Sequence, residues 1–176
     1  MGEKIVLIVG PSGVGKDTLL KSIKKEFNNK INFVRRYITR EADNNENNYF
    51  LEATAFSILQ TNGFFVSSWL AHGNSYGISK TSIKKGVNLI SISRAKIKDF
   101  EASFDDVITI NITVSKEVLR KRLENRGRES KEEVEKRLSR SYEKLEAKNL
   151  IEFDNSLTKE EATNKFIKVI EKIIAV

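Results

Sequence analysis

A glycine-rich segment, Gly10-Pro11-Ser12-Gly13-Val14-Gly15-Lys16-Asp17, directly follows an apolar run at residues 5–9. Residues 18–27, which come next, have the pattern of a helix. Glycine adopts backbone conformations closed to other residues, so successive amide N–H groups in such a loop can converge on one anion at a helix N-terminus. This order of strand, loop and helix predicts a phosphate-binding loop near the start of an α/β fold.

The segment matches G-x-x-x-x-G-K-[ST] except at its last position, where Asp17 stands in place of Ser or Thr. We expect Lys16 to reach the β and γ phosphates of a nucleoside triphosphate. The usual hydroxyl ligand of Mg²⁺ is missing, so Asp17, directly or through water, or Thr18 becomes the candidate ligand. The alternative, a glycine-rich turn with a solvated lysine, does not explain the order of the three elements.

Composition narrows the class of protein. The 176 residues suit one domain, and the absence of Cys excludes disulfides and thiolate metal sites. The longest apolar run, residues 5–9, is far too short for a membrane span, so we expect a soluble cytoplasmic protein. A net charge of +7 indicates an anionic partner. Because the basic residues interleave with glutamates and no nucleic-acid-binding motif accompanies them, we expect a small phosphorylated substrate and no nucleic-acid or membrane partner.

Hydrophobic patterning predicts strands alternating with helices. The expected strands cover residues 4–9, 32–38, 64–69, 87–92 and 107–114. The expected helices cover residues 16–28, 54–61, 79–85, 94–101, 116–126, 131–148 and a last one from 158. A loop is predicted at 41–48, and Gly73 and Gly77 indicate a turn or hairpin. This alternation predicts a mainly parallel sheet flanked by helices on both faces.

Three helix starts have recognisable N-terminal signals. Ser115 is a candidate N-cap, and Ser130 with Glu133 and Thr158 with Glu161 each match a capping box. The helix from 131 shows only a narrow apolar stripe, which is typical of a half-solvated element such as a lid.

Two groups of arginines suit phosphate chemistry. Arg36 and Arg40, with Tyr76 and His72, supply donors for a second phosphate-bearing molecule. The alternative is that they are ordinary surface charges, and a lone His beside a glycine turn is more often structural than catalytic.

The second group follows the strand at 107–114. Arg122 and Arg126 lie four apart on one helix, and Arg137 follows the next capping box. Arginines on a closing lid stabilise charge during phosphoryl transfer. Glutamates at helical spacing offer the alternative of surface ion pairs.

These motifs, in this order, resemble the guanylate kinase fold family over nearly the whole chain. The segments that carry the resemblance are the glycine-rich loop, Thr39-Arg40, Tyr76-Gly77 and Arg122-Leu123-Glu124-Asn125-Arg126-Gly127. A narrower set resembles the ribose 1,5-bisphosphate phosphokinase branch, which also carries Asp after the loop lysine. That set is Gly15-Lys16-Asp17, Arg36-Tyr37-Ile38-Thr39-Arg40, Ser67-Ser68-Trp69, Ser93-Arg94-Ala95 and Leu123-Glu124-Asn125-Arg126-Gly127-Arg128-Glu129.

The resemblance implies an ATP-dependent kinase that phosphorylates ribose 1,5-bisphosphate to 5-phosphoribosyl 1-diphosphate (PRPP), a step linked to phosphonate catabolism. It further implies one P-loop kinase domain over residues 1–176, with an acceptor-binding insertion at about 36–85 and a lid at about 126–140. Monomer and homodimer both remain open.

Departures from guanylate kinases bear on the acceptor. A guanine-reading glutamate of those enzymes aligns on Ser67 and an acidic residue on Ser91, while a phosphate-binding arginine and tyrosine align on Asp43 and Asn48. Losing both carboxylates removes the partners of the base, so guanine selectivity is not expected. Phosphorylation of GMP is the alternative reading, and a non-catalytic interaction module is a third that the intact loop disfavours.

The predicted site residues follow. ATP is assigned to Gly10, Pro11, Ser12, Gly13, Val14, Gly15, Lys16, Asp17, Thr18, Arg122 and Asn155. The catalytic residues are Lys16, Arg126 and Arg137. The acceptor is assigned to Arg36, Tyr37, Arg40, His72, Tyr76, Ser93 and Arg94, and Mg²⁺ to Asp17.

Overall fold

The computed structural model describes residues 2–41, 48–127, 130–141 and 144–175, without the side chains of residues 126, 137, 140 and 141. Most of the loop predicted at 41–48, including Asp43, lies outside that description. The chain divides into two compact units. Unit 1 comprises Met1–Leu7 and Ile31–Ile108, and unit 2 comprises Ile8–Lys30 and Thr109–Val176.

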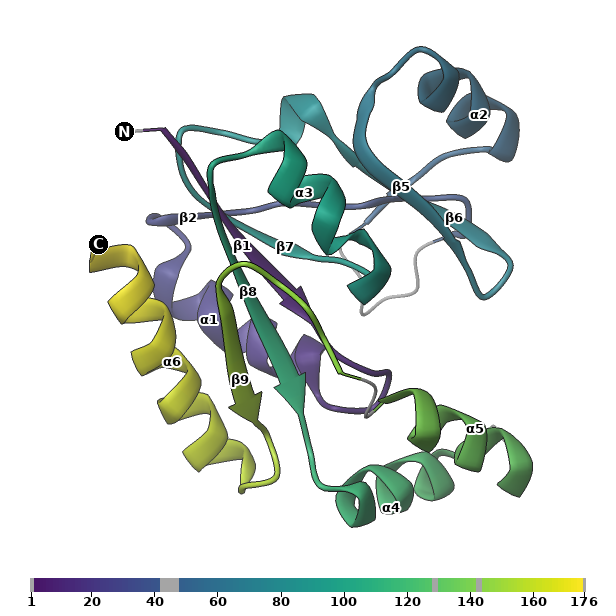
Figure 1. Cartoon of the computed structure of the whole chain (residues 1–176), viewed down its shortest axis with the longest axis vertical. Helices are drawn as coiled ribbons and strands as arrows, with labels where there is room; N and C mark the ends of the chain where they lie inside the picture. Colours follow the sequence, from purple (N-terminus) through teal and green to yellow (C-terminus); the bar gives the residue numbers. More distant parts are fainter. Residues whose placement is uncertain (1, 42–47, 128–129, 142–143, 176) are drawn as a thin grey trace. The chain divides into compact units, whose positions relative to one another are not determined.

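One sheet has five strands in the order β2-β7-β1-β8-β9 (Figure 1). They are β1 (Glu3–Val9), β2 (Ile31–Phe33), β7 (Gly86–Ser91), β8 (Asp106–Thr113) and β9 (Leu150–Asp154). β2 pairs in parallel with β7, and β8 in parallel with β9. Residues 5–9 of β1 are fully buried, as in the central strand of a parallel sheet. The predicted α/β fold with a parallel sheet is confirmed.

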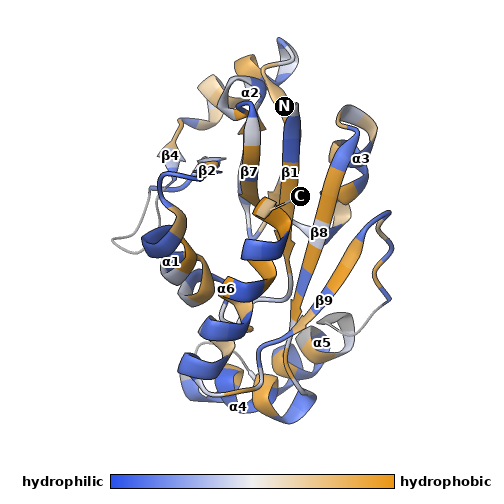
Figure 2. Cartoon of the chain, turned by 90° about the vertical axis from the view of Figure 1, so that its left-hand side faces the viewer, coloured by the Kyte–Doolittle hydropathy of each residue, from blue (hydrophilic) through white to orange (hydrophobic). Residues whose placement is uncertain are grey.

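Unit 2 contains four helices: α1 (Lys16–Phe27), α4 (Lys116–Arg126), α5 (Lys131–Ser141) and α6 (Lys159–Ala175). Apolar side chains recur every three or four residues on α6, where Ala162, Phe166 and Ile170 are buried. Phe166 packs on Phe153 of β9, with ring centroids 4.8 Å apart. Figure 2 shows β8 and β9 mainly apolar, whereas α6 has both apolar and polar surfaces.

Both predicted capping boxes form. The backbone N–H of Ser130 donates to Glu133 at 2.8 Å, and the N–H of Glu133 donates to the Ser130 hydroxyl at 3.3 Å. Thr158 and Glu161 make the same reciprocal pair at 3.3 and 3.4 Å. These bonds satisfy amides that a helix start leaves without partners, which is why the sequence marks both boundaries correctly.

Unit 1 contains a second, four-stranded sheet in the order β4-β3-β6-β5. Its strands are β3 (Tyr37–Ile38), β4 (Tyr49–Phe50), β5 (Phe65–Ala71) and β6 (Asn74–Ser79). β5 and β6 form the predicted hairpin. The unit's helices are α2 (Ala53–Thr61) and α3 (Ile97–Ser103), and two 3₁₀ turns are η1 (Lys80–Ser82) and η2 (Arg94–Lys96).

Three predicted elements are wrong in extent. The helix expected at 79–85 is only the turn η1, because the Ser79 hydroxyl caps the N–H of Thr81 and the chain is extended again at Ile83. The helix expected at 131–148 ends at Ser141, since residues 150–154 extend the sheet as β9. The extended segment at 32–38 is split into β2 and β3, which belong to different sheets.

The capping box of α6 predicts a pH effect. Hydrogen bonds from the hydroxyl and the backbone N–H of Thr158 lower the pKa of Glu161 below its usual 4.5. A carboxyl whose pKa is lower in the folded state stabilises the fold above its unfolded pKa, and this is lost as the pH falls through the folded pKa. Glu161→Gln should therefore lower the Tm at pH 7, and the deficit should disappear in acid. The matched control is Glu160→Gln in the same helical turn; an equal, pH-independent effect of both changes would contradict this assignment.

Candidate functional site

The glycine-rich loop joins β1 to α1 in unit 2. Gly10, Gly13 and Gly15 have φ angles of 146°, 98° and 91°, which other residues rarely adopt. A Cβ at Gly10 would collide with the backbone oxygen of Ile112. Within the described residues, the backbone amides at 12–15 have no hydrogen-bond partner, so four successive donors remain for a ligand.

Two side chains hold the outer side of this loop at the Val14 carbonyl. Asn155 donates its Nδ2 to that oxygen at 2.5 Å, and Arg122 donates at 3.1 Å. Arg122 also donates to the backbone oxygen of Asn155 at 3.3 Å, so the three residues form one cluster. Asn155 is buried, and a Cβ at Gly15 would lie 2.7 Å from its Nδ2. The structure thus brings Arg122 and Asn155 to a backbone carbonyl of the loop, and their predicted contact with ATP stays a prediction.

Lys16 begins α1, and its ammonium donates to the carbonyls of Gly10 and Pro11 at 2.6 and 2.9 Å. These bonds hold the charge against the loop. Asp17 and Thr18 follow in the first helical turn and are exposed. Among the described residues Asp17 has no hydrogen bond or ion pair, so its carboxylate oxygens remain available to a hard cation.

Helix α4 lies beside the loop, and the lid predicted at about 126–140 begins at its last residue and continues through most of α5; the lid role stays a prediction. Gly13 of the loop lies against α4, because a Cβ there would be 3.2 Å from Leu119 and 3.3 Å from Leu123. Ser115 caps α4 as predicted, accepting from the N–H of Val118 at 3.3 Å. Hydrogen bonds to the Glu117 carboxylate from the backbone N–H of Glu117 and from the Ser115 hydroxyl lower the pKa of this carboxyl.

Arg120 of α4 pairs with Glu135 of α5, and this hydrogen bond raises the pKa of the guanidinium. The pair is exposed and joins the two helices. Arg126 lies at the end of α4 and Arg137 within α5, but their side chains fall outside the described part of the chain. Their catalytic role stays a prediction.

The predicted acceptor residues all belong to unit 1, where strand register sorts them by face. Ile38 lies opposite Tyr76, and Tyr76 lies opposite Trp69. Directly paired residues share a face, and so do residues two apart in one strand. This face, the acceptor face, carries Arg36, Tyr76, Trp69 and Ser67. Arg36 stacks over the Tyr76 ring at 5.8 Å, and that ring stacks on Trp69 at 5.5 Å with an interplanar angle of 7°.

Tyr37 is not brought together with Arg36. It lies opposite Gly77 on the other face of the sheet, where a Cβ at Gly77 would strike the Phe65 ring. Its ring contacts Tyr49, Phe64 and Phe65 at centroid distances of 4.9 to 5.8 Å. Tyr37 therefore packs in an aromatic cluster, and its contact with the acceptor stays a prediction.

His72 lies in the hairpin turn, outside the paired strand residues. With Gly73 it forms the two-residue turn of the β5–β6 hairpin, with φ angles of 51° and 74°. It is exposed, and its backbone carbonyl accepts from Asn74 at 3.0 Å. The turn explains why a polar residue stands there.

Arg40, Ser93 and Arg94 are half-buried. Ser93 precedes the turn η2, which begins at Arg94 and leads into α3. Of the four substitutions relative to guanylate kinases, three lie in the described residues. Asn48 accepts a hydrogen bond from Arg36 at 3.3 Å, Ser67 is buried, and Ser91 is the half-buried last residue of β7.

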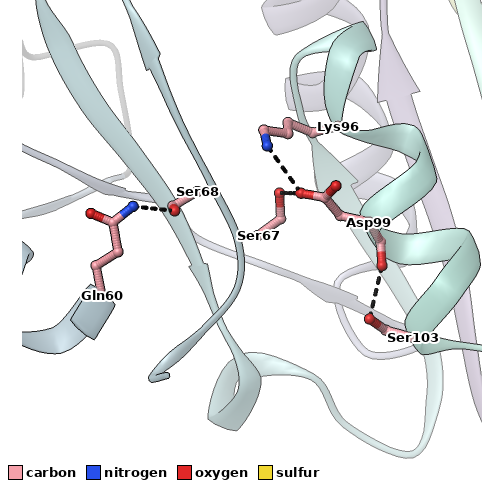
Figure 3. A network of polar contacts seen from close by, with 6 residues as sticks. All are labelled: Gln60, Ser67, Ser68, Lys96, Asp99 and Ser103. Atoms are coloured by element: carbon pink, nitrogen blue, oxygen red, sulfur yellow. Dashed lines mark hydrogen bonds and ion pairs between the residues drawn. The ribbon is translucent and has the colours of Figure 1, made fainter. Parts of the chain in front are cut away.

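Sequence reasoning missed a polar network on the acceptor face (Figure 3). The Ser67 hydroxyl donates to Asp99 of α3 at 2.6 Å, and Lys96 forms an ion pair with the same carboxylate oxygen at 3.2 Å. The sequence shows only the i, i+3 spacing of Lys96 and Asp99. The contact between Ser67 and Asp99 joins residues 32 positions apart, so the sequence does not reveal it. Trp69, also unassigned, is detectable only through its register with Tyr76.

Two further observations concern metal binding and membrane spans. No group of three or more His, Cys, Asp or Glu side chains in the described residues is arranged to hold a metal ion. A single carboxylate such as Asp17 with phosphate oxygens remains compatible with Mg²⁺, which commonly binds in that manner. None of the helices described is long and apolar enough to cross a membrane.

A glycine-rich phosphate-binding loop between a parallel strand and a helix, followed by an arginine-bearing helical pair, defines a P-loop kinase. The family model for guanylate kinase matches residues 2–175, so the chain belongs to the guanylate kinase family. This is a family of ATP-dependent kinases, which agrees with the predicted nucleotide.

Individual proteins similar to this chain carry a more specific name than the family does. The chain is 36% identical over 97% of its length to ribose 1,5-bisphosphate phosphokinase PhnN of Rhizobium etli, covering 91% of that protein. It is 34% identical to the Burkholderia pseudomallei protein of the same name, covering 96% of both chains. Among solved structures, guanylate kinase from Anaplasma phagocytophilum matches with a TM-score of 0.63 at 23% identity, over 98% of this chain and 86% of that one, which supports the fold.

The Val14 cluster predicts a loss of ATP affinity on substitution. Asn155→Ala removes one of the donors to the Val14 carbonyl. Losing this hydrogen bond destabilises the loop conformation that binds ATP by about 1–3 kcal/mol, so we expect ATP to bind roughly 5- to 100-fold more weakly. Arg122→Ala should act in the same direction. Isothermal titration with ATP measures both.

The matched control is Lys121→Ala, an exposed cation on the same helix. If Lys121→Ala weakened ATP binding as much as the other two changes do, general electrostatics would replace the carbonyl contact as the cause.

Proposed function

We propose that this chain is a cytoplasmic, ATP-dependent phosphotransferase that phosphorylates the 1-phosphate of ribose 1,5-bisphosphate and forms PRPP, in the context of phosphonate catabolism. The observation that carries the proposal is the near full-length similarity to enzymes named for this substrate, together with the acceptor face of unit 1. That face offers cations and aromatic rings for a sugar phosphate, with Ser67 where guanylate kinases read a base.

The residues proposed to bind ATP, the phosphoryl donor, belong to unit 2. The free amides at 12–15 and the ammonium of Lys16 suit the β and γ phosphates, and the Val14 cluster fixes the loop that presents them. The first carboxylate after the lysine, Asp17, is the proposed ligand of Mg²⁺. Bound there, Mg²⁺ would supply positive charge that neutralises the phosphates during transfer.

The acceptor atom needs no general base. A phosphate monoester has a second pKa near 6, so the 1-phosphate is largely dianionic at neutral pH and its oxygen is already nucleophilic. That oxygen attacks the γ-phosphorus, the bond from the γ-phosphorus to the bridging oxygen of ADP breaks, and the phosphoryl group moves to the acceptor. Catalysis then consists of in-line placement and charge neutralisation by Lys16 and the lid arginines Arg126 and Arg137.

On the acceptor side, Arg36 is the strongest phosphate-binding candidate. Its guanidinium is oriented from two sides, by the Tyr76 ring and by Asn48, which leaves the remaining N–H donors of its fork in a fixed direction. Arg40 and Arg94 supply further positive charge on the same unit. Tyr37 and His72 are the weakest members of the predicted set, because their contacts lie in the aromatic cluster and the hairpin turn.

GMP is the second candidate acceptor, because the matching family is named for guanylate kinase. An assay of ADP release with ribose 1,5-bisphosphate, GMP and water as acceptors separates the two. We expect turnover with the ribose bisphosphate and not with GMP. Preferred turnover of GMP would overturn the proposal.

Lys16→Ala should reduce kcat by about 10²- to 10³-fold, because one preorganised charge at the transferring group is lost. The Tm should change little, because the ammonium lies at loop carbonyls at the start of α1 and is not part of the apolar core. Lys21→Ala, an exposed lysine on the same helix, is the control. Normal phosphate transfer by the Lys16 variant would remove this residue from the mechanism.

Asp17→Asn tests the proposed metal ligand. It should raise the Mg²⁺ concentration needed for half-maximal turnover and leave thermal stability nearly unchanged, because the side chain is exposed and unpartnered. Glu26→Gln, near the other end of α1, serves for comparison. A Mg²⁺ titration identical to that of the unmodified chain would refute the role of Asp17.

A further inference from the structure

The carboxylate of Asp99 is held on the acceptor face by two donors. Ser67, which is 4% exposed, donates its hydroxyl at 2.6 Å, and the Lys96 ammonium lies 3.2 Å from the same oxygen, Oδ2 (Figure 3). The Ser103 hydroxyl donates to the backbone oxygen of Asp99 at 2.8 Å and supports the helix there. Neither Ser67 nor Asp99 is among the residues assigned above to ATP or to the acceptor.

Strand register places this network beside the proposed phosphate-binding group. Ser67 pairs with Ile78, and Trp69, two residues further along β5, pairs with Tyr76. Ser67, Trp69 and Tyr76 therefore share one face of the sheet, and Arg36 stacks on the Tyr76 ring from that face. A register irregularity between Phe65 and Ser67 turns Phe65 to the other face.

A carboxylate in this position needs an explanation. A face that binds a bisphosphate repels negative charge, and the ion pair with Lys96 offsets that repulsion only in part because both side chains are about one-third exposed. The other oxygen, Oδ1, has no partner among the described residues. A carboxylate accepts through both oxygens, so Oδ1 is an oriented acceptor with free lone pairs.

We infer that Asp99 accepts a hydrogen bond from a ring hydroxyl of the sugar phosphate acceptor, and so selects ribose over deoxysugar phosphates. The inference rests on the proposed function. Ribose 1,5-bisphosphate offers two kinds of group, phosphates that need donors and hydroxyls that need acceptors. Arg36 meets the first need and Asp99 the second, while Ser67 and Lys96 are positioning residues that fix the Asp99 carboxylate.

The test compares acceptors that differ by one hydroxyl. For Asp99→Asn we expect kcat/KM with ribose 1,5-bisphosphate to fall about 10- to 100-fold, the effect of a hydrogen bond to a charged group. The 2-deoxy and 3-deoxy analogues each lack one ring hydroxyl. With the analogue that lacks the hydroxyl contacted by Asp99, the variant and the unmodified chain should have the same kcat/KM. Asp105→Asn, an exposed aspartate of the same unit, is the control.

A second readout does not depend on turnover. The chain has one tryptophan, Trp69, stacked on Tyr76, so its fluorescence reports binding of an acceptor in the absence of ATP. Asp99→Asn should weaken ribose 1,5-bisphosphate in this titration. Ser67→Ala should weaken it to a smaller extent, and Ser67→Thr, which keeps the hydroxyl, should restore it.

The outcomes separate the two proposals. Equal losses with the ribose and both deoxyribose bisphosphates, or no loss at all, would overturn the role of Asp99 and leave the proposed function intact. If the unmodified chain and Asp105→Asn both failed to phosphorylate ribose 1,5-bisphosphate, the proposed function and this inference would fall together.

Discussion

The carbonyl oxygen of Val14 is the point on which the nucleotide site depends. In a loop whose amides turn toward an anion, the carbonyls must turn the other way, and a buried carbonyl without a partner is costly. Asn155 and Arg122 both donate to this oxygen, one from the end of β9 and the other from α4. Segments more than a hundred residues from the loop therefore fix which way its amides point. The glycines permit the conformation, and these two side chains select it.

In unit 1, the alternation of side chains along each strand determines which residues face the proposed acceptor site. Because successive side chains point to opposite faces, one short sheet carries an aromatic cluster around Tyr37 and Phe65 on one side and Arg36, Tyr76 and Trp69 on the other. The cluster packs one side of the small sheet, and on the acceptor face the polar groups lie beside the buried side chains of Ile38 and Ile78.

Features with local causes could be read from the sequence. The glycine-rich loop, the Ser130 and Thr158 capping boxes and the β5–β6 hairpin are each set by a few neighbouring residues, and all are present. Features with tertiary causes could not. β9 is a strand because β8 offers it a parallel edge, and its five residues alone do not distinguish strand from the end of a helix. Tyr37 was assigned to the acceptor from its neighbours Arg36 and Arg40, yet alternation sends its ring to the other face. Likewise, Asp99 gains its meaning only through Ser67, on a different element.

Chemical-shift mapping of the ¹⁵N-labelled chain during titration with Mg²⁺ and ATP tests most directly whether the loop amides bind the triphosphate. If the Val14 cluster presents the amides at 12–15 to the triphosphate, the resonances of Gly13 and Gly15 should shift and saturate at one equivalent, and the side-chain amide of Asn155 should remain hydrogen-bonded. Binding of ATP that left these loop resonances unmoved, or no binding at all, would contradict the account.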